Sequence, residues 1–293
     1  MLKYLTLAVL LLFLYRCTQK TDKKVPEKTA ENTQQFKLYS KSVADTFSIS
    51  VSLPNDYEPK KPYPVVYLLD ANLYFDIIAT TLHKYSEVGL TAPVILIGIG
   101  YKDFQTMDSL RNRDYTYPIA IPEYEMDVSG GADRFLAFIE TELIPFMDEK
   151  FKPDTSNRIL AGHSLGGYFS MYALWRNLPR KGGLFNGYIM ASPSIHYNHY
   201  WLIDQLESLE PQKKQGKKTK IYLTFGGLED AENEEDADLE SSNKTAERLS
   251  KLLSTKQANY LDYKCEIFSN LGHMDTPFPT SVKGLQWILN DEE

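Results

Sequence analysis

The sequence is short of cysteine and carries no excess of positive charge. Its 293 residues include two cysteines, Cys17 and Cys265, which can supply neither a disulfide framework nor a set of zinc ligands. Lysine and arginine number 32 against 39 acidic residues, and the net charge of −7 argues against a nucleic-acid partner. With 43% hydrophobic residues, the composition is that of a globular protein, not of a disordered, collagen-like or coiled-coil chain. We expect no metal and no cofactor.

The N-terminal residues have the pattern of an export signal. The apolar run Leu5–Leu14 is too short to span a membrane comfortably but has the length of a signal-peptide core. Cys17 follows where a bacterial lipoprotein carries its lipidated cysteine, although two bulky residues precede it in place of small ones. We therefore predict a signal peptide or lipoprotein signal over residues 1–17 and a flexible linker over 18–33. The protein is expected to be periplasmic or at the cell surface, tethered at Cys17, held by an uncleaved anchor, or released.

Residues 34–293 are predicted to form one α/β domain, because no composition break or repeat divides them. Apolar runs typical of strands are Lys37–Tyr39, Thr46–Leu53, Val65–Leu69, Val94–Ile99, Arg158–Ala161, Tyr188–Ala191, Ile221–Phe225 and Tyr263–Phe268. Patterns typical of helices are Asp133–Met147, Gly166–Trp175, Tyr200–Leu209, Thr245–Leu253 and Thr280–Leu289. Their alternation predicts a mostly parallel sheet of about eight strands with helices on both faces. Function then belongs in the loops that follow the strands.

One serine lies in a motif that carries chemistry. Gly162-His163-Ser164-Leu165-Gly166-Gly167 follows the expected strand Arg158–Ala161 and opens a helix. A G-x-S-x-G at a sharp strand-to-helix turn needs glycines where the backbone comes close, and it projects the serine hydroxyl from the top of the sheet. Ser164 is therefore the predicted nucleophile.

A serine hydroxyl needs a base, and in this fold the chain order is serine, acid, histidine. His83 and His163 precede the serine, and His163 is more simply explained as packing within the turn. His196 and His199 follow the next strand too closely to leave room for an acid between. His273, in a loop between the last expected strand and the final helix, is the predicted general base.

The acid should follow the strand Ile221–Phe225, where Glu229 and Asp230 are adjacent. We predict Glu229, which would accept the other imidazole N–H and stabilise the imidazolium, with Asp230 as the alternative. The main-chain N–H groups of Asn72, after the third strand, and of Leu165 are the predicted oxyanion hole. Each such donor is typically worth about 3–4 kcal/mol.

Six segments, taken in order, match one family: Tyr63–Asp70, Gly98–Tyr101, Arg111–Thr116, Gly162–Gly167, Ser192–Ser194 and Gly272–His273. In combination they resemble the putative-esterase family of α/β-hydrolases over about residues 36–290, and most of all its siderophore-esterase-like branch. The family also includes S-formylglutathione hydrolases, feruloyl and acetyl-xylan esterases and mycolyltransferases. The resemblance implies the α/β-hydrolase fold and the nucleophile, base and oxyanion hole given above. Some siderophore-type members rely on a Ser–His pair, which would make Glu229 a weak partner.

Substrate choice is expected in the segment Tyr101–Gly131, whose lack of clear periodicity predicts a functional loop or lid. The predicted substrate-binding residues are Arg111, Arg113, Tyr115, His196 and Tyr197. In one interpretation the arginines pair with an anionic aromatic acyl group, such as a catecholate, and the tyrosines cover its ring. In the other, Arg113 forms a local ion pair with Asp114 and the aromatic residues only pack.

The sequence thus predicts a serine carboxylic-ester hydrolase that acts through an acyl-enzyme on a small-molecule ester, siderophore-type or other. Three alternatives stay open. The first is a feruloyl- or acetyl-type carbohydrate esterase. The second is an acyltransferase, which the same residues support if a bound alcohol outcompetes water. The third is a non-catalytic surface binding protein that has kept the turn as a scaffold. The oligomeric state is left open as well.

Overall fold

The computed structural model describes residues 33–180, 183–209, 218–232, 240–256 and 261–290. The expected signal (1–17) and nearly all of the expected linker (18–33) lie outside these residues. Residues from 32 onward form one compact unit. In the described ranges, no helix is both long enough and apolar enough to cross a membrane.

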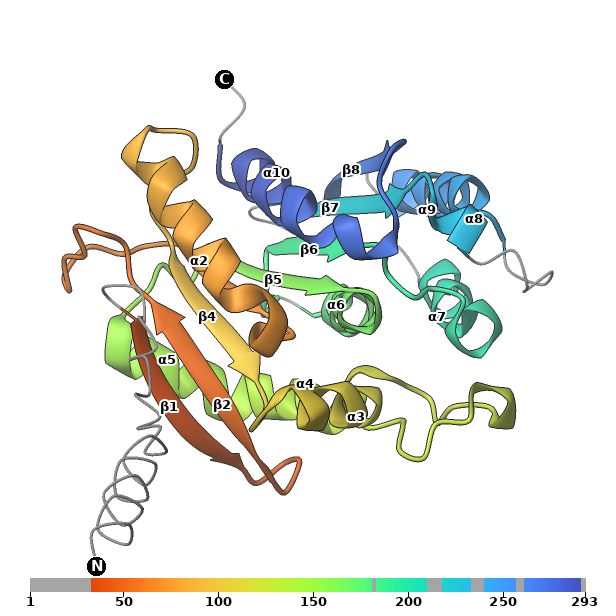
Figure 1. The fold of residues 1–293 in the computed structure, drawn as a ribbon, viewed down its shortest axis with the longest axis horizontal. Helices are drawn as coiled ribbons and strands as arrows, with labels where there is room; N and C mark the ends of the chain where they lie inside the picture. Colours follow the sequence, from red (N-terminus) through yellow and green to blue (C-terminus); the bar gives the residue numbers. More distant parts are fainter. Residues whose placement is uncertain (1–32, 181–182, 210–217, 233–239, 257–260, 291–293) are drawn as a thin grey trace, which may run out of the picture. The chain divides into compact units, whose positions relative to one another are not determined.

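Within the described residues, the centre of the fold is an eight-stranded sheet with the order β1-β2-β4-β3-β5-β6-β7-β8 (Figure 1). The strands are β1 (Thr33–Ser40), β2 (Asp45–Ser52), β3 (Val65–Leu68), β4 (Ile95–Gly100), β5 (Arg158–His163), β6 (Gly187–Ala191), β7 (Thr219–Gly226) and β8 (Leu261–Phe268). Strands β1 and β2 form an antiparallel hairpin, and β2 pairs antiparallel with β4. All further pairs, from β4–β3 to β7–β8, are parallel. The predicted α/β-hydrolase architecture is confirmed.

Helices cover both faces of this sheet. The α-helices are α2 (Ala71–Glu87), α3 (Phe104–Tyr115), α4 (Ala132–Phe138), α5 (Ile144–Phe151), α6 (Leu165–Asn177), α7 (Tyr197–Glu207), α8 (Glu229–Glu232), α9 (Ser242–Lys256) and α10 (Pro277–Leu289). Short 3₁₀ turns are η1 (Pro122–Tyr124) and η4 (His273–Asp275), and the π-helix η2 (Ile139–Leu143) joins α4 to α5. Apolar residues of α2 and α10 share one core cluster with the strands, and those of α4, α6, α7 and α9 share the other.

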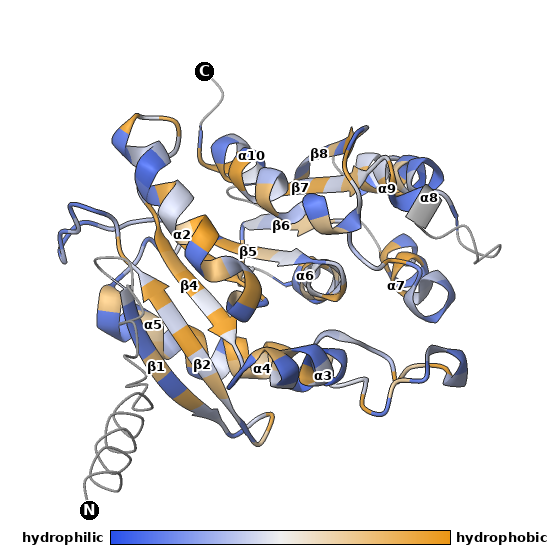
Figure 2. Cartoon of the chain, in the orientation of Figure 1, coloured by the Kyte–Doolittle hydropathy of each residue, from blue (hydrophilic) through white to orange (hydrophobic). Residues whose placement is uncertain are grey.

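Burial explains why these segments became strands. Every residue of β3, β4 and β6 is buried, because helices cover both of their sides. Figure 2 shows the hydrophobic residues gathered along the inner strands, whereas β1 at the edge alternates. A continuous apolar run bounded by polar residues was therefore a reliable sign of a central strand.

The prediction of a loop over Tyr101–Gly131 is wrong for its first half. Helix α3 occupies Phe104–Tyr115, and the side chain of Asp103 caps it by accepting from the N–H of Thr106 at 2.8 Å. This helix buries only Met107, Asp114 and Tyr115, so it shows no apolar stripe in the sequence. The second half carries only the 3₁₀ turn η1.

A buried ion pair joins the start of α2 to α3. The guanidinium of Arg111 donates from Nε to Asp70 Oδ1 at 3.0 Å and from Nη2 to Oδ2 at 2.9 Å. Asp70 is 2% exposed and has a left-handed backbone with φ of 51°. Arg111 Nη2 also donates to the main-chain oxygen of His163 at 3.3 Å. The pair therefore links the first residues of α2 to the end of β5.

We expect Arg111→Met to lower the free energy of unfolding by about 3–5 kcal/mol, because it leaves the Asp70 carboxylate buried without its counter-charge. Urea denaturation measures this loss. Arg180→Met is the matched control, because Arg180 pairs with Glu140 at the surface, where exposed pairs are worth about 0–1 kcal/mol. Equal losses in the two variants would contradict a structural role for the buried pair.

Candidate active site

The turn between β5 and α6 holds Ser164 in a conformation that is rare for a residue with a side chain. Its φ is 57° and its ψ is −120°. Hydrogen bonds fix both of its main-chain groups. The Ser164 N–H donates to Ala191 O at 3.0 Å, and Ser164 O accepts from the N–H groups of Tyr168 (2.9 Å) and Ser194 (3.1 Å). The serine side chain is thus presented by a strained but well-supported backbone.

Two glycines let this turn form. A methyl group on Gly162 would lie 2.3 Å from the carbonyl oxygen of Gly166, and one on Gly167 would lie 2.9 Å from Cα of Pro193. Real Cβ atoms do not come that close, so no other residue fits without moving the backbone. The strand-to-helix turn that the motif predicts is therefore present, with these glycines at its points of closest approach.

The structure brings His273 and Glu229 together. His273 opens η4 after β8, and Glu229 opens α8 after β7. His273 Nδ1 lies 3.1 Å from Glu229 Oε2. The neighbouring Asp230 is exposed, and its carboxylate accepts from the N–H of Ser242, the first residue of α9, at 2.6 Å. Of the two adjacent acids, Glu229 is the one that contacts the histidine.

Further hydrogen bonds hold the Glu229 carboxylate. Its Oε1 accepts from the hydroxyl of Ser192 and from the main-chain N–H of Gly226. The hydroxyls of Ser192 and Thr276 lie 2.7 Å apart. Burial raises the pKa of Glu229, but the hydrogen bonds from His273, Ser192 and Gly226 outweigh it and hold this pKa below its usual range. The carboxylate is therefore charged at neutral pH and can accept an imidazole N–H.

The loop that carries His273 adjoins the serine turn. His163, the residue before the serine, has its ring centroid 4.6 Å from that of His273. Ser164 Oγ lies 3.2 Å from Ser194 Oγ, a buried hydroxyl in the segment after β6. The sequence analysis assigned no role to Ser192, Ser194 or Thr276. The position of the first two after a parallel strand was the signal that could have found them.

The predicted oxyanion-hole residues stand at two helix starts. Asn72 is the second residue of α2 and Leu165 the first of α6, and the first N–H groups of a helix have no acceptor within the helix. The side-chain amide of Asn72 is bonded to the main chain of Tyr101, donating to its O at 3.0 Å and accepting from its N–H at 2.7 Å. This amide ties α2 to the end of β4.

The predicted substrate-binding residues have other partners. Arg111 is paired with Asp70. Arg113 donates twice to Asp114 and once to Asp45, which is the local ion pair that the alternative interpretation proposed. In the described conformation both guanidinium groups thus pair with carboxylates of the chain itself, and their binding of an anionic substrate stays a prediction.

Two of the predicted aromatic residues are buried. Tyr115 and Tyr197 are 0% and 1% exposed, so neither ring offers a surface to a bound ester. The hydroxyl of Tyr197 donates to Pro118 O at 2.9 Å, and the hydroxyl of Tyr115 accepts from the N–H of Asp70 at 3.2 Å. His196 is half-buried and stays a candidate.

The segment between α3 and α4 is hydrogen-bonded to the residues at the start of α7. The hydroxyl of Tyr124 donates to His196 O at 3.0 Å. The amide of Asn198, which the sequence analysis did not single out, donates to Ile119 O at 2.8 Å and accepts from the N–H of Ile121 at 3.2 Å. The segment predicted as a functional loop or lid is therefore held, in its second half, against the start of α7.

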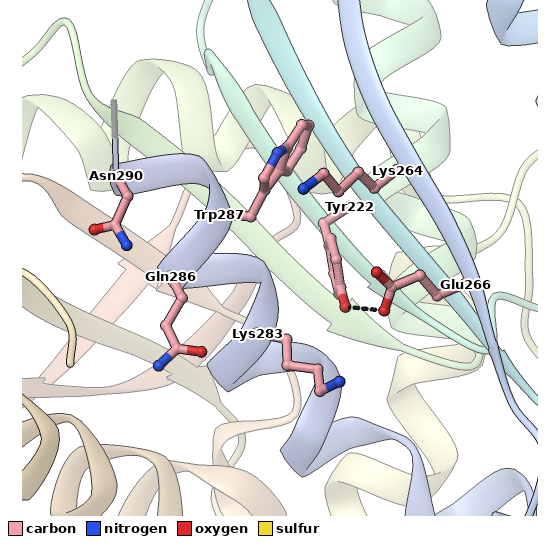
Figure 3. Close-up of a pocket in the computed structure, with 7 residues that line it drawn as sticks. All are labelled: Tyr222, Lys264, Glu266, Lys283, Gln286, Trp287 and Asn290. Carbon is pink, nitrogen blue, oxygen red and sulfur yellow. Dashed lines mark hydrogen bonds between the residues drawn. The ribbon is translucent and has the colours of Figure 1, made fainter. Parts of the chain in front are cut away.

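A pocket of about 440 Å³ lies elsewhere, between β7, β8 and α10 (Figure 3). It is lined by Tyr222, Lys264, Glu266, Lys283, Gln286, Trp287 and Asn290. The Tyr222 hydroxyl donates to Glu266 at 2.6 Å. No residue predicted for the active site lines it. Over the described ranges, no group of three or more His, Cys, Asp or Glu residues is placed to hold a metal ion.

Known proteins resemble this chain over most of its length. The ferri-bacillibactin esterase BesA of Bacillus subtilis is 32% identical over 212 residues, which are 69% of this chain and 72% of that protein. The apo-salmochelin esterase of Escherichia coli is 27% identical over 235 residues, or 78% and 70%. The crystal structure of the BES protein from Bacillus cereus has a TM-score of 0.73 at 29% identity and covers 90% of this chain and 97% of that one.

A family comparison agrees with these individual matches. The model of the putative esterase family matches residues 40–278, which is most of the chain. The residues that it spans include the serine turn, the Glu229–His273 contact and all three strands that lead to them. The chain therefore belongs to the putative esterase family and is an ester hydrolase.

Proposed function

We propose that this esterase works through an acyl-enzyme formed on Ser164, with His273 as general base and Glu229 as the acid of the triad. The observation that carries the proposal is the contact of 3.1 Å between His273 Nδ1 and Glu229 Oε2, beside a serine held at the strained turn. A charged, buried carboxylate that accepts from Nδ1 fixes the tautomer in which Nε2 of the same ring is the proton-accepting nitrogen.

The reaction then runs in two halves. Ser164 Oγ attacks the ester carbonyl while His273 Nε2 takes the hydroxyl proton, and the N–H groups of Asn72 and Leu165 stabilise the oxyanion. The tetrahedral intermediate collapses, the C–O bond to the alcohol breaks, and the imidazolium gives its proton to the leaving oxygen. Water repeats the sequence, with its proton passing to His273 and then to Ser164 as the acid leaves.

We propose a siderophore-type ester as the substrate. The support is the relatives, whose names include ferri-bacillibactin, apo-salmochelin and triacetylfusarinine C esterases. A structure named as a ferulic acid esterase is similar at 14% identity and a TM-score of 0.59, a likeness of fold alone. A carbohydrate esterase and an acyltransferase are the competing proposals, and product analysis with and without an added alcohol separates hydrolysis from transfer.

Site variants test the triad and the substrate together. We expect Ser164→Ala to abolish turnover of a catecholate trilactone and of p-nitrophenyl acetate, and Glu229→Gln to lower kcat by about 10²–10⁴-fold. Asp230→Asn is the matched control and should keep the wild-type kcat, since Asp230 only caps α9. Wild-type turnover by Ser164→Ala would overturn the proposal, and an unaffected Glu229→Gln would favour a Ser–His pair.

A comparison of substrates tests the siderophore assignment. A feruloyl ester or acetylated sugar that outperforms the trilactone would reject it.

Stability should depend on pH through Glu229. Because its folded pKa lies below its ordinary value of 4.5, the unfolded chain binds the proton first as the pH falls. The stabilisation is present above the ordinary value and is lost as the pH falls through the folded one. Urea denaturation from neutral to acid pH should therefore show the stability difference between wild type and Glu229→Gln shrinking towards acid. A difference that stays constant would contradict the lowered pKa.

We propose that the protein is exported, on the strength of the signal-like residues 1–17. Tethering through Cys17 would place the esterase at a membrane surface. Metabolic labelling with a lipid precursor is expected to mark the wild-type protein and to spare Cys17→Ser. Labelling that is equal in the two proteins, or missing from both, would reject the lipid tether.

A further inference from the structure

We propose that His163 is a positioning residue for the base. Its imidazole holds the main chain of His273, so that the histidine loop keeps its place beside the serine turn. The inference rests on the proposed function, since it takes His273 as the base.

Both ring nitrogens of His163 are engaged. Nε2 lies 3.0 Å from the main-chain oxygen of His273, and Nδ1 lies 3.0 Å from the hydroxyl of Tyr74. A carbonyl oxygen can only accept, so Nε2 carries the proton. Nδ1 then has a free lone pair and accepts from the Tyr74 hydroxyl. One neutral tautomer satisfies both contacts, and neither nitrogen is left to act as a base itself.

The surroundings keep this ring neutral. His163 is 5% exposed, and burial together with the nearby His273 lowers its pKa to about 3. Its ring centroid is 4.6 Å from that of His273, which becomes an imidazolium each time it takes the serine proton. A neutral neighbour adds no charge repulsion at that moment, whereas a lysine or arginine at this position would.

The position of His163 in the chain makes the contact effective. The residue directly precedes Ser164. Its backbone therefore enters the serine turn, while its side chain contacts the loop that carries His273. The hydroxyl of Thr276 donates to the same His273 oxygen at 3.1 Å. Glu229 orients the ring of His273, while His163 and Thr276 hold its main chain. Misplacement of a reacting group by about 1 Å can cost about 10²-fold in rate, so this anchoring has a measurable consequence.

Three substitutions at His163 separate the donor from the bulk of the side chain. The amide nitrogen of glutamine can stand where Nε2 stands, whereas that of asparagine reaches only to the position of Nδ1. Phenylalanine keeps the ring and has no donor. On p-nitrophenyl acetate, we expect His163→Phe and His163→Asn to lower kcat by about 10–100-fold with KM little changed. His163→Gln should restore most of kcat, and the rate at which a fluorophosphonate labels Ser164 should follow the same order.

Control variants distinguish a failure of the proposed function from a failure of the positioning role of His163. Ser164→Ala in the same assay tests the proposed function, and wild-type turnover by that variant would reject it. With Ser164→Ala inactive, a wild-type kcat in His163→Phe, or equal rates for His163→Asn and His163→Gln, would overturn the positioning role. Thermal unfolding of all variants is measured in parallel. If the phenylalanine variant does not fold, the comparison of glutamine with asparagine decides, because both are polar and differ only in where the amide stands.

Discussion

The close approach of Gly162 to the carbonyl of Gly166 is the constraint on which the site depends. It allows the chain to pass from a buried strand to a helix within one residue, and Ser164 is that residue. The positive φ of Ser164 costs free energy. The hydrogen bonds that its main chain makes to the end of β6 and to the segment after it offset this cost. The same turn makes Leu165 the first residue of α6, so its N–H has no acceptor within the helix.

The parallel strands bring the other residues of the site close to this turn. Strands β3, β5, β6, β7 and β8 run in one direction, so the residues that follow them meet at one edge of the sheet (Figure 1). Glu229, the proposed acid, follows β7, and β6 lies between that strand and β5, which leads to Ser164. Ser192, at the end of β6, spans this gap by donating to Glu229. Glu229 is therefore held by a residue that follows β6, the strand next to the one that leads to Ser164.

Features that depend on neighbouring residues could be predicted from the sequence, and features that depend on residues far apart in the chain could not. Central strands and the serine turn have local signatures, so they were predicted within a few residues. The ion pair of Arg111 could not be predicted from the sequence, because its partner Asp70 lies 41 residues away. Helix α3 was missed because its few buried side chains give it no apolar stripe. The contact of His163 with His273 spans 110 residues, and no local pattern encodes it.

Two buried titratable groups, Glu229 and His163, flank the proposed base His273, and one is held charged while the other is held neutral. Burial disfavours the charged form of both, but Glu229 receives three hydrogen bonds that favour its anion, while His163 has an acceptor at Nε2 and a donor at Nδ1 that suit only its neutral form. His273 thus has one fixed negative charge on one side and an uncharged ring on the other. Glu229 is therefore placed to stabilise the positive charge that the proposed mechanism develops on this ring, and His163 adds no charge of its own.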